Sequence, residues 1–170
     1  MSWNLDYRYA VLCLHDVNSV EALNSLLTDY ASSVLKAYRE TTDYPDCMDD
    51  VFGRVEEGEF SSEEEIIQAI ADIVALYLDE VECTEEGVSL VVRCEEDTEY
   101  DDTDFVAELA AYLFAKSHNP YFIIHRAAYD NSGGYSHQWI GRRKNGSVLV
   151  EYLPDFLDNL WNEPAAAVFV

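Results

Sequence analysis

The chain has 170 residues and a formal net charge of −24, from 34 acidic residues against ten lysines and arginines. A charge this negative argues against direct binding to DNA, RNA or an anionic membrane, and it favours basic proteins or cations as partners. Hydrophobic residues make up 49% of the sequence, enough for a core, so we expect a single domain over residues 1–170.

The N-terminal segment predicts one strand followed by one long helix. Apolar and polar residues alternate over residues 6–15, which is the pattern of a β-strand. Apolar residues then recur at helical spacing from Val20 to Tyr38, and Asn18 or Ser19 stands where a helix cap is needed. We therefore expect an amphipathic helix of about 20 residues with one face in the core.

The next segment predicts a loop and a second helix. Residues 40–60 are irregular, so we expect a loop with one short helical turn at 46–54. Ser61 or Ser62 can cap the helix that follows. The three acidic residues in its first turn also stabilise the helix, because they lie at the positive end of its dipole. Its apolar face continues through residues 63–78, which predicts that the helix packs on the core along this length.

The middle of the chain predicts a turn, a strand and a third helix. Glu85-Glu86-Gly87 is typical of a turn, and residues 88–94 have the β-branched composition of a strand. After an acidic run, Thr103 or Asp104 is expected to cap a helix over residues 105–117.

The last third predicts an antiparallel meander over residues 121–152, with strands at 121–129, 135–144 and 147–152. Asn145-Gly146 is a strong hairpin signal, because both positions of a type I′ turn need a positive φ. Residues 154–170 predict a short helix from Pro154 to about Trp161 and an apolar tail that packs on the body or on another chain. The whole pattern predicts an α+β fold with a mixed or antiparallel sheet, a C-terminal β-meander and three to four helices that back the sheet.

The negative charge is concentrated in one part of the chain. Residues 40–104, the acidic block, hold 24 acidic residues against Arg54 and Arg93, whereas the segments before and after it are nearly neutral. A salt-adapted protein would spread its carboxylates over its whole surface. The observed distribution therefore favours a dedicated acidic surface.

The acidic block resembles nucleic acid in its amount of charge. Its 22 net negative charges equal those of roughly 11 base pairs, since duplex DNA carries one charge per about 1.7 Å of axis. Its acidic residues also come in spaced pairs and triplets that would imitate a row of phosphates if the fold held them rigidly. The predicted partner-binding residues are Asp49, Asp50, Glu56, Glu57, Glu63, Glu64, Glu65, Asp79, Glu80, Glu85, Glu86, Glu95, Glu96, Asp101 and Asp102.

No catalytic, nucleotide-binding or metal-binding motif accompanies this block, so we expect a protein that is not an enzyme and uses no cofactor. His125 and His137 are expected on neighbouring strands. With Tyr135 they either line a polar site or simply cover a half-exposed sheet. Residues 97–104 lack the glycine and the terminal glutamate of a calcium loop, so no metal site is predicted.

Two smaller features bear on the interactions of the chain. Arg142-Arg143-Lys144 is a basic cluster beside a predicted turn; it either protects a strand edge from aggregation or pairs with an acidic face of this chain or of a second copy. The four cysteines are widely spaced and form no C-x-x-C pair, so we expect reduced thiols at Cys13, Cys47, Cys83 and Cys94.

These features predict an acidic nucleic-acid mimic that binds and inhibits a DNA- or RNA-binding protein, such as an anti-restriction or anti-CRISPR inhibitor of a phage or mobile element. An immunity or antitoxin protein that neutralises a basic nuclease toxin would use the same electrostatics. An acidic protein of a salt-adapted cytoplasm and an acidic subunit of an assembly are further alternatives. In the first two cases the partner is a basic nucleic-acid-binding protein, either a nuclease or an effector complex. The number of copies in the assembly, including a homodimer, stays open.

The sequence also bears on where the protein acts. No stretch reaches the roughly 18 apolar residues that span a bilayer. Residues 1–8 lack the basic and apolar regions of a signal peptide. We therefore expect a soluble protein of the cytoplasm, which would be the host's cytoplasm if a phage encodes it.

Overall fold

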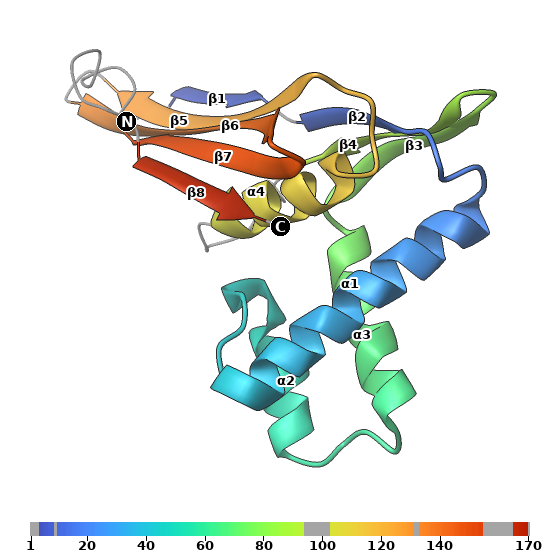
Figure 1. Ribbon diagram of the computed structural model, residues 1–170. Coiled ribbons are helices and arrows are strands. Elements are labelled where there is room, and N and C mark those ends of the chain that lie inside the picture. Colours follow the sequence, from blue (N-terminus) through green and yellow to red (C-terminus); the bar gives the residue numbers. More distant parts are fainter. Residues whose placement is uncertain (1–3, 9, 94–102, 131–132, 155–164, 170) are drawn as a thin grey trace.

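The computed structural model describes residues 4–8, 10–93, 103–130, 133–154 and 165–169 (Figure 1). Along the chain its elements are β1 (Asn4–Arg8), β2 (Ala10–Leu14), α1 (Val20–Thr41), the 3-10 helix η1 (Asp46–Met48), α2 (Asp49–Glu56), α3 (Glu63–Ala75), β3 (Leu78–Thr84), β4 (Gly87–Val92), α4 (Thr103–Phe114), β5 (Tyr121–Asp130), β6 (Gly133–Lys144), β7 (Ser147–Pro154) and β8 (Ala165–Phe169). The described residues thus confirm an α+β fold with antiparallel sheets, four α-helices and a C-terminal β-meander.

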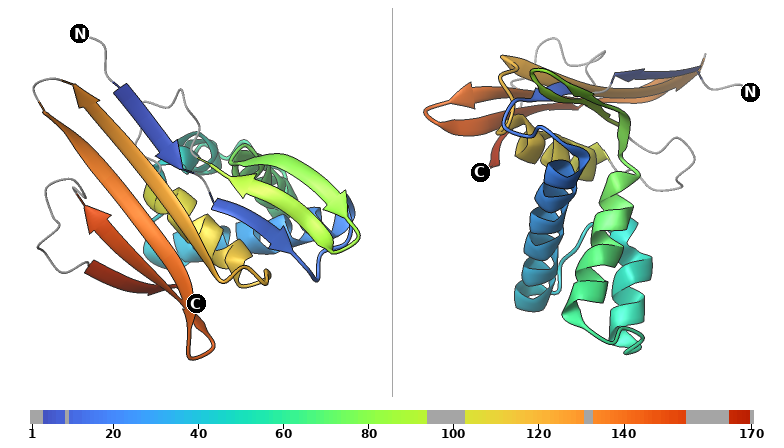
Figure 2. Two further views of the ribbon diagram at one scale, coloured as in Figure 1. Left: turned by 90° about the horizontal axis from the view of Figure 1, so that it is seen from above. Right: turned by 90° about the vertical axis from the view of Figure 1, so that its right-hand side faces the viewer.

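The strands form two sheets that lie side by side (Figure 2). The larger sheet has the order β1-β5-β6-β7-β8, in which β5, β6 and β7 are the predicted meander. The described part of the apolar tail forms β8 and pairs with β7, so it packs on the body of the molecule. The smaller sheet has the order β2-β4-β3, and β2 contacts β5 where the two sheets meet. Of the helix predicted from Pro154 to Trp161, Pro154 ends β7, and residues 155–161 lie outside the described residues.

The strand predicted over residues 6–15 is instead two strands in different sheets. β1 pairs with β5, whereas β2 pairs with β4. The alternating pattern continues through both strands because alternation depends on the burial of one strand face. It contains no information about which strand lies alongside. The prediction was right about strand conformation and wrong about continuity.

The helix predicted over residues 63–78 ends three residues early, and strand β3 follows it. Tyr77 is buried three positions after the buried Val74, so the helical spacing of apolar residues persists although the backbone has already left the helix. β3 was missed because it is an edge strand. Five of its seven residues are exposed and several are acidic, which leaves no alternating apolar pattern to recognise.

The helices lie on one side of the sheets and divide into two groups. α4 lies against the sheets, and its side chains Val106, Leu109 and Leu113 are fully buried. The helical arm, which consists of α1, η1, α2 and α3 (residues 20–75), extends away from the sheets, with α1 packed against α3 (Figures 1 and 2). The caps predicted for the arm are confirmed, because the hydroxyls of Ser19 and Ser62 accept hydrogen bonds from the first turns of α1 and α3. The cap predicted at Thr103 or Asp104 was wrong, because α4 already begins at Thr103 and both residues lie in its first turn.

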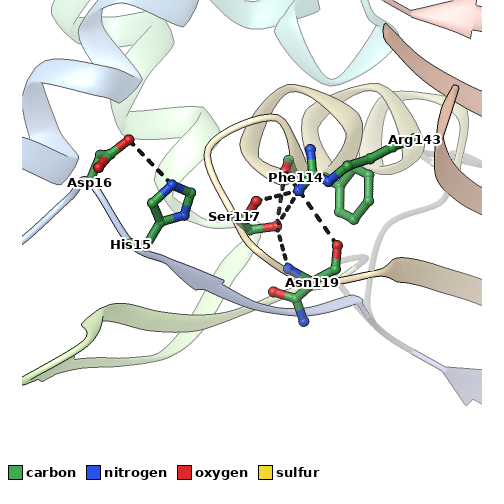
Figure 3. Close-up of polar contacts among 6 residues, drawn as sticks. All are labelled: His15, Asp16, Phe114, Ser117, Asn119 and Arg143. Carbon is green, nitrogen blue, oxygen red and sulfur yellow. Dashed lines mark hydrogen bonds and ion pairs between the residues drawn. The ribbon is translucent and has the colours of Figure 1, made fainter. Parts of the chain in front are cut away.

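A polar junction joins α4 to the two sheets (Figure 3). The guanidinium of Arg143, on β6, donates to the carbonyls of Phe114 at 3.0 Å and of Ser117, just after the last turn of α4. It also lies 4.3 Å from the centre of the Phe114 ring. Asn119 completes the junction by accepting from the backbone N–H of Cys13, on β2, at 3.0 Å. The contacts of Arg143 thus add a donor to the carbonyl of the last residue of α4 and to one just after it, where the helix itself supplies no donor.

The basic cluster at residues 142–144 therefore contains side chains with different roles. Arg142 pairs with Glu151 on the neighbouring strand β7, and Arg143 binds the end of α4. Lys144 is exposed at the end of β6. The sequence left two interpretations of the cluster, protection of a strand edge or pairing with acidic residues. Arg142 fits pairing within the chain, although its partner Glu151 lies outside the acidic block.

Two tight turns fix the registers of the hairpins. Asn145 and Gly146 have φ angles of 52° and 79°, as the predicted type I′ turn requires. Gly87, with a φ of 142°, ends the turn of the β3–β4 hairpin. A Cβ atom at this position would lie 1.9 Å from the carbonyl oxygen of Leu14, so a larger residue would push β2 away.

Candidate functional site

The predicted partner-binding residues on the helical arm form one group, the arm cluster. All seven are exposed and stand on α2, directly after it or in the first turn of α3; they are Asp49, Asp50, Glu56, Glu57, Glu63, Glu64 and Glu65. The inward faces of the same helices carry buried apolar residues, such as Phe52 and Ile66. The arm cluster is therefore held on ordered elements.

Part of the arm cluster gathers around the last turn of α1. Arg39 pairs with Glu63 at 2.6 Å, and the hydroxyl of Tyr38 donates to Glu56 at 3.3 Å. Burial, with the charge of Glu56 beside it, raises the pKa of Tyr38. Glu65 accepts from the backbone N–H of Ser61 at 2.8 Å and so helps to cap α3. Glu63 and Glu65 thus have roles within the fold.

A second group, the hairpin cluster, lies on the β3–β4 hairpin. It consists of Asp79, Glu80, Glu85 and Glu86. Asp79 pairs with Arg93 at 3.2 Å, and the pairing register shifts between residues 79 and 82, where Glu80 has a φ of 50°. Glu85 and Glu86 form the exposed turn of the hairpin.

The two clusters occupy different ends of the described structure. The β3–β4 hairpin belongs to the sheet layer, whereas the arm cluster lies where α2 and α3 extend away from it (Figures 1 and 2). The other predicted partner-binding residues, Glu95, Glu96, Asp101 and Asp102, lie outside the described residues. Within the described part of the chain, the acidic block is therefore divided into two surfaces.

His125 and His137 lie on β5 and β6 of the larger sheet, which carries neither cluster. His125 pairs with Gln138 and His137 pairs with Arg126, so the register places the two histidines in adjacent rows, which belong to opposite faces of a sheet. Tyr135 stands two positions before His137. The backbone register thus gives no support to a shared site at His125, His137 and Tyr135.

A different pair of histidines is in contact. The rings of His15 and His118 stack with centroids 3.3 Å apart, and His15 lies 3.3 Å from the carboxylate of Asp16 (Figure 3 shows this ion pair). This contact joins the end of β2 to the segment that follows α4. Sequence spacing gave no sign of it, because the two residues are far apart in the chain.

The metal-ligating residue types do not converge within the described residues. Over the ranges that the structure describes, no group of three or more His, Cys, Asp or Glu side chains is arranged to hold a metal ion. Cys13, Cys47 and Cys83 form no disulfide among the described residues, and Cys94 lies outside them, as does most of the 97–104 segment.

A groove beside the arm cluster is the main feature that the sequence reasoning missed. It has a volume of about 440 Å³ and lies between α1, residues 43–47 and the first turns of α4. The floor is mostly apolar or aromatic, with Tyr30, Val34 and Phe105 among its residues. The carboxylates that line it are Asp43, Asp46, Asp104 and Glu108.

The polar groups of the groove differ in exposure, because its four carboxylates are exposed whereas Tyr30 is buried. Burial raises the pKa of Glu108 above its usual value. Tyr30 is 4% exposed, and burial, followed by the charges of Glu108 and Cys47, raises the pKa of its hydroxyl. Burial, followed by the neighbouring Asp49, raises the pKa of Tyr44, which lines the groove beside the start of the arm cluster. These acidic residues stand singly in the sequence, so a search for pairs and triplets passed over them.

Comparisons with known proteins do not add a family to these observations. The chain matches no family model, no curated protein and no solved structure. Among the described helices, none combines the length and the apolar character needed to cross a bilayer.

Proposed function

We propose that this protein is an acidic inhibitor that binds a basic nucleic-acid-binding protein in place of nucleic acid, most simply an anti-restriction or anti-CRISPR inhibitor of a phage or mobile element. Its carboxylates take the positions that phosphates occupy in the complex of that partner with DNA or RNA. The contact is made through the arm cluster first, with the hairpin cluster as a second, separate contact.

The observation that supports the proposal most is the exposure of carboxylates on ordered elements, most of which have no basic partner within the described part of the chain. Of the eleven predicted partner-binding residues that the structure describes, ten are exposed and Asp79 is half-buried. Within the described residues, Glu63 and Asp79 have a basic partner, and the others have none. Carboxylates held in this way repel one another, and a partner's lysines and arginines relieve that repulsion.

The experiment is capture of the partner on immobilised protein at low and high salt, followed by competition with duplex DNA and RNA. We expect a nucleic-acid-binding protein to be retained, to be released as salt rises and to be displaced by nucleic acid. The retained protein is then assayed for nucleic-acid binding with and without this chain. Capture that persists in high salt, or a partner that binds nucleic acid equally well in the complex, would contradict the proposal.

Matched variants separate the two clusters. Glu57→Gln/Glu64→Gln removes two charges from the arm cluster, Glu85→Gln/Glu86→Gln removes two from the hairpin, and Glu21→Gln/Asp29→Asn removes two exposed charges from outside the acidic block. We expect the arm variant to weaken capture most, by about threefold to tenfold, because each exposed pair contributes roughly 0.2–1 kcal/mol. Equal effects of all three variants would show that net charge alone drives binding.

The identity of the captured partner decides between the first proposal and its closest alternative. A restriction or CRISPR component supports an anti-defence inhibitor, whereas one toxin nuclease held tightly supports an immunity protein. Because both use exposed carboxylates, the arm and hairpin variants test the shared electrostatic mechanism in either case.

A further inference from the structure

We propose that the groove between α1, residues 43–47 and the start of α4 receives an arginine side chain of the partner. The groove, defined by its lining residues above, lies next to the arm cluster, because its lining residues 43–47 lead into α2, where the cluster begins at Asp49. The proposal rests on the proposed function, since the arginine belongs to that basic partner, and it identifies where on the acidic surface the partner is anchored.

The charge of the groove determines the class of ligand. Four carboxylates line it, and no lysine or arginine does so among the described residues. An anion such as a phosphate or a nucleotide would be repelled, whereas a cation would be attracted. Its volume of about 440 Å³ is near the lower end of the range for ligand pockets, roughly 300–1,000 Å³, which suits one side chain with its adjoining backbone.

The hydroxyl of Tyr30 is a second observation that points to a ligand. The side chain is more than nine-tenths buried, lines the groove and has no hydrogen-bond partner among the described residues. Burial raises the pKa of its hydroxyl most, followed by the charges of Glu108, Cys47 and Tyr112, of which Glu108 and Cys47 also line the groove. The hydroxyl oxygen is not among the fully buried side-chain atoms of the described residues that lack a partner, so it is accessible and can accept a hydrogen bond from a ligand in the groove.

The aromatic rings favour arginine over lysine. Tyr30, Tyr44 and Phe105 all line the groove, and a guanidinium stacks on aromatic faces while it donates to carboxylates. The chain itself uses this contact at two other places, where Arg54 lies over Phe60 at 4.7 Å and Arg143 over Phe114 at 4.3 Å. Arginine in a pocket is also a common energetic centre of protein interfaces.

The test is titration of the full chain with the tripeptide acetyl-Gly-Arg-Gly-amide, followed by NMR. We expect saturable shifts confined to groove residues such as Val34 and Ala37, weaker binding of the lysine peptide and no binding of the glutamine peptide. Shifts spread over the acidic surface without saturation, or equal binding of the lysine and arginine peptides, would overturn the proposal.

Variants then assign the binding to the groove. Asp104→Asn/Glu108→Gln should weaken binding of the arginine peptide by about fourfold to tenfold, because two exposed ion pairs with the guanidinium are lost. Tyr30→Phe keeps the ring and should weaken binding severalfold. The control Glu21→Gln/Asp72→Asn removes two exposed charges outside the groove and should stay within twofold. An equal loss in the control would contradict the assignment.

The two proposals fail in different ways. If the peptide does not saturate the groove while a nucleic-acid-binding partner is still captured, the groove assignment is wrong and the proposed function stands. If the peptide binds in the groove but no such partner is captured, the arginine site stands and the proposed function is wrong.

Discussion

The helical arm holds 14 acidic residues against three basic ones, whereas the strands of the larger sheet hold three acidic residues against five basic ones. Both regions bury apolar side chains in one connected core, so the difference lies in what each region presents to solvent. The arm keeps its fold despite self-repulsion because its inward faces are apolar and aromatic. In the sheet layer, basic side chains serve the fold itself, as Arg143 does at the end of α4.

The largest effect is expected from removing the aromatic anchor of the arm. Phe52 is fully buried, and its ring centre lies 4.1 Å from that of Tyr38 and 4.7 Å from that of Tyr44. We expect Phe52→Ala to lower the free energy of unfolding by about 3–5 kcal/mol, measured by urea denaturation. Because the arm also bears the concentrated charge, hydrogen exchange should show α1 and α3 losing protection before β5 and β6.

The control is Phe52→Leu, which keeps most of the apolar volume and should cost clearly less. If Phe52→Ala reduced protection in α1 and β5 to the same extent, the arm and the sheet layer would unfold together, and the proposed difference between them would not extend to stability.

A smaller effect is expected in the sheet layer from Arg143. Arg143→Ala removes charged hydrogen bonds to the carbonyls that follow α4 and the contact with the Phe114 ring, so we expect a loss of about 1.5–3 kcal/mol on urea denaturation. Arg143→Lys keeps the charge but not the planar fork and should recover part of the loss. Lys144→Ala, at an exposed neighbour, should change stability by less than about 0.5 kcal/mol. A similar loss in both alanine variants would assign the effect to charge alone.

Local signals in the sequence predicted the helices of the arm well. Ser19 and Ser62 cap α1 and α3 because capping depends on residues three positions apart, and the amphipathic pattern of α1 depends on its own period. The pairing of strands in the sheets was harder to predict from the sequence. The division between β1 and β2 depends on β5 and β4, which lie far along the chain, and the edge strand β3 has no apolar pattern to report it.

For the candidate site, too, local features could be predicted from the sequence and tertiary arrangement could not. Pairs such as Glu56-Glu57 and Glu85-Glu86 are visible in the sequence, and the structure places them on ordered and exposed positions. Their division between the arm and the hairpin depends on tertiary structure and was not visible. The groove was hidden for the same reason, since Tyr30 and Glu108 stand on α1 and α4 and meet only when the chain is folded.

The smallest effect concerns Glu108, where the arm meets α4. Burial raises its pKa in the folded protein, so the native state binds the proton of this carboxyl more tightly than the unfolded chain does. As pH rises through the unfolded value of about 4.3 towards the folded value, the charged carboxylate becomes a net cost to folding, and the cost stays constant at higher pH. Glu108→Gln should therefore stabilise the protein at pH 7 by less than about 1 kcal/mol, since the residue is exposed and solvent screens its charge. The gain over the wild type should disappear below about pH 4, where the carboxyl is protonated in both states. Thermal unfolding of both proteins from pH 3 to pH 8 measures this difference. A gain that is independent of pH would mean that the glutamine acts through packing. The carboxylate of Glu108 would then have no electrostatic cost in the folded protein that a bound cation could relieve.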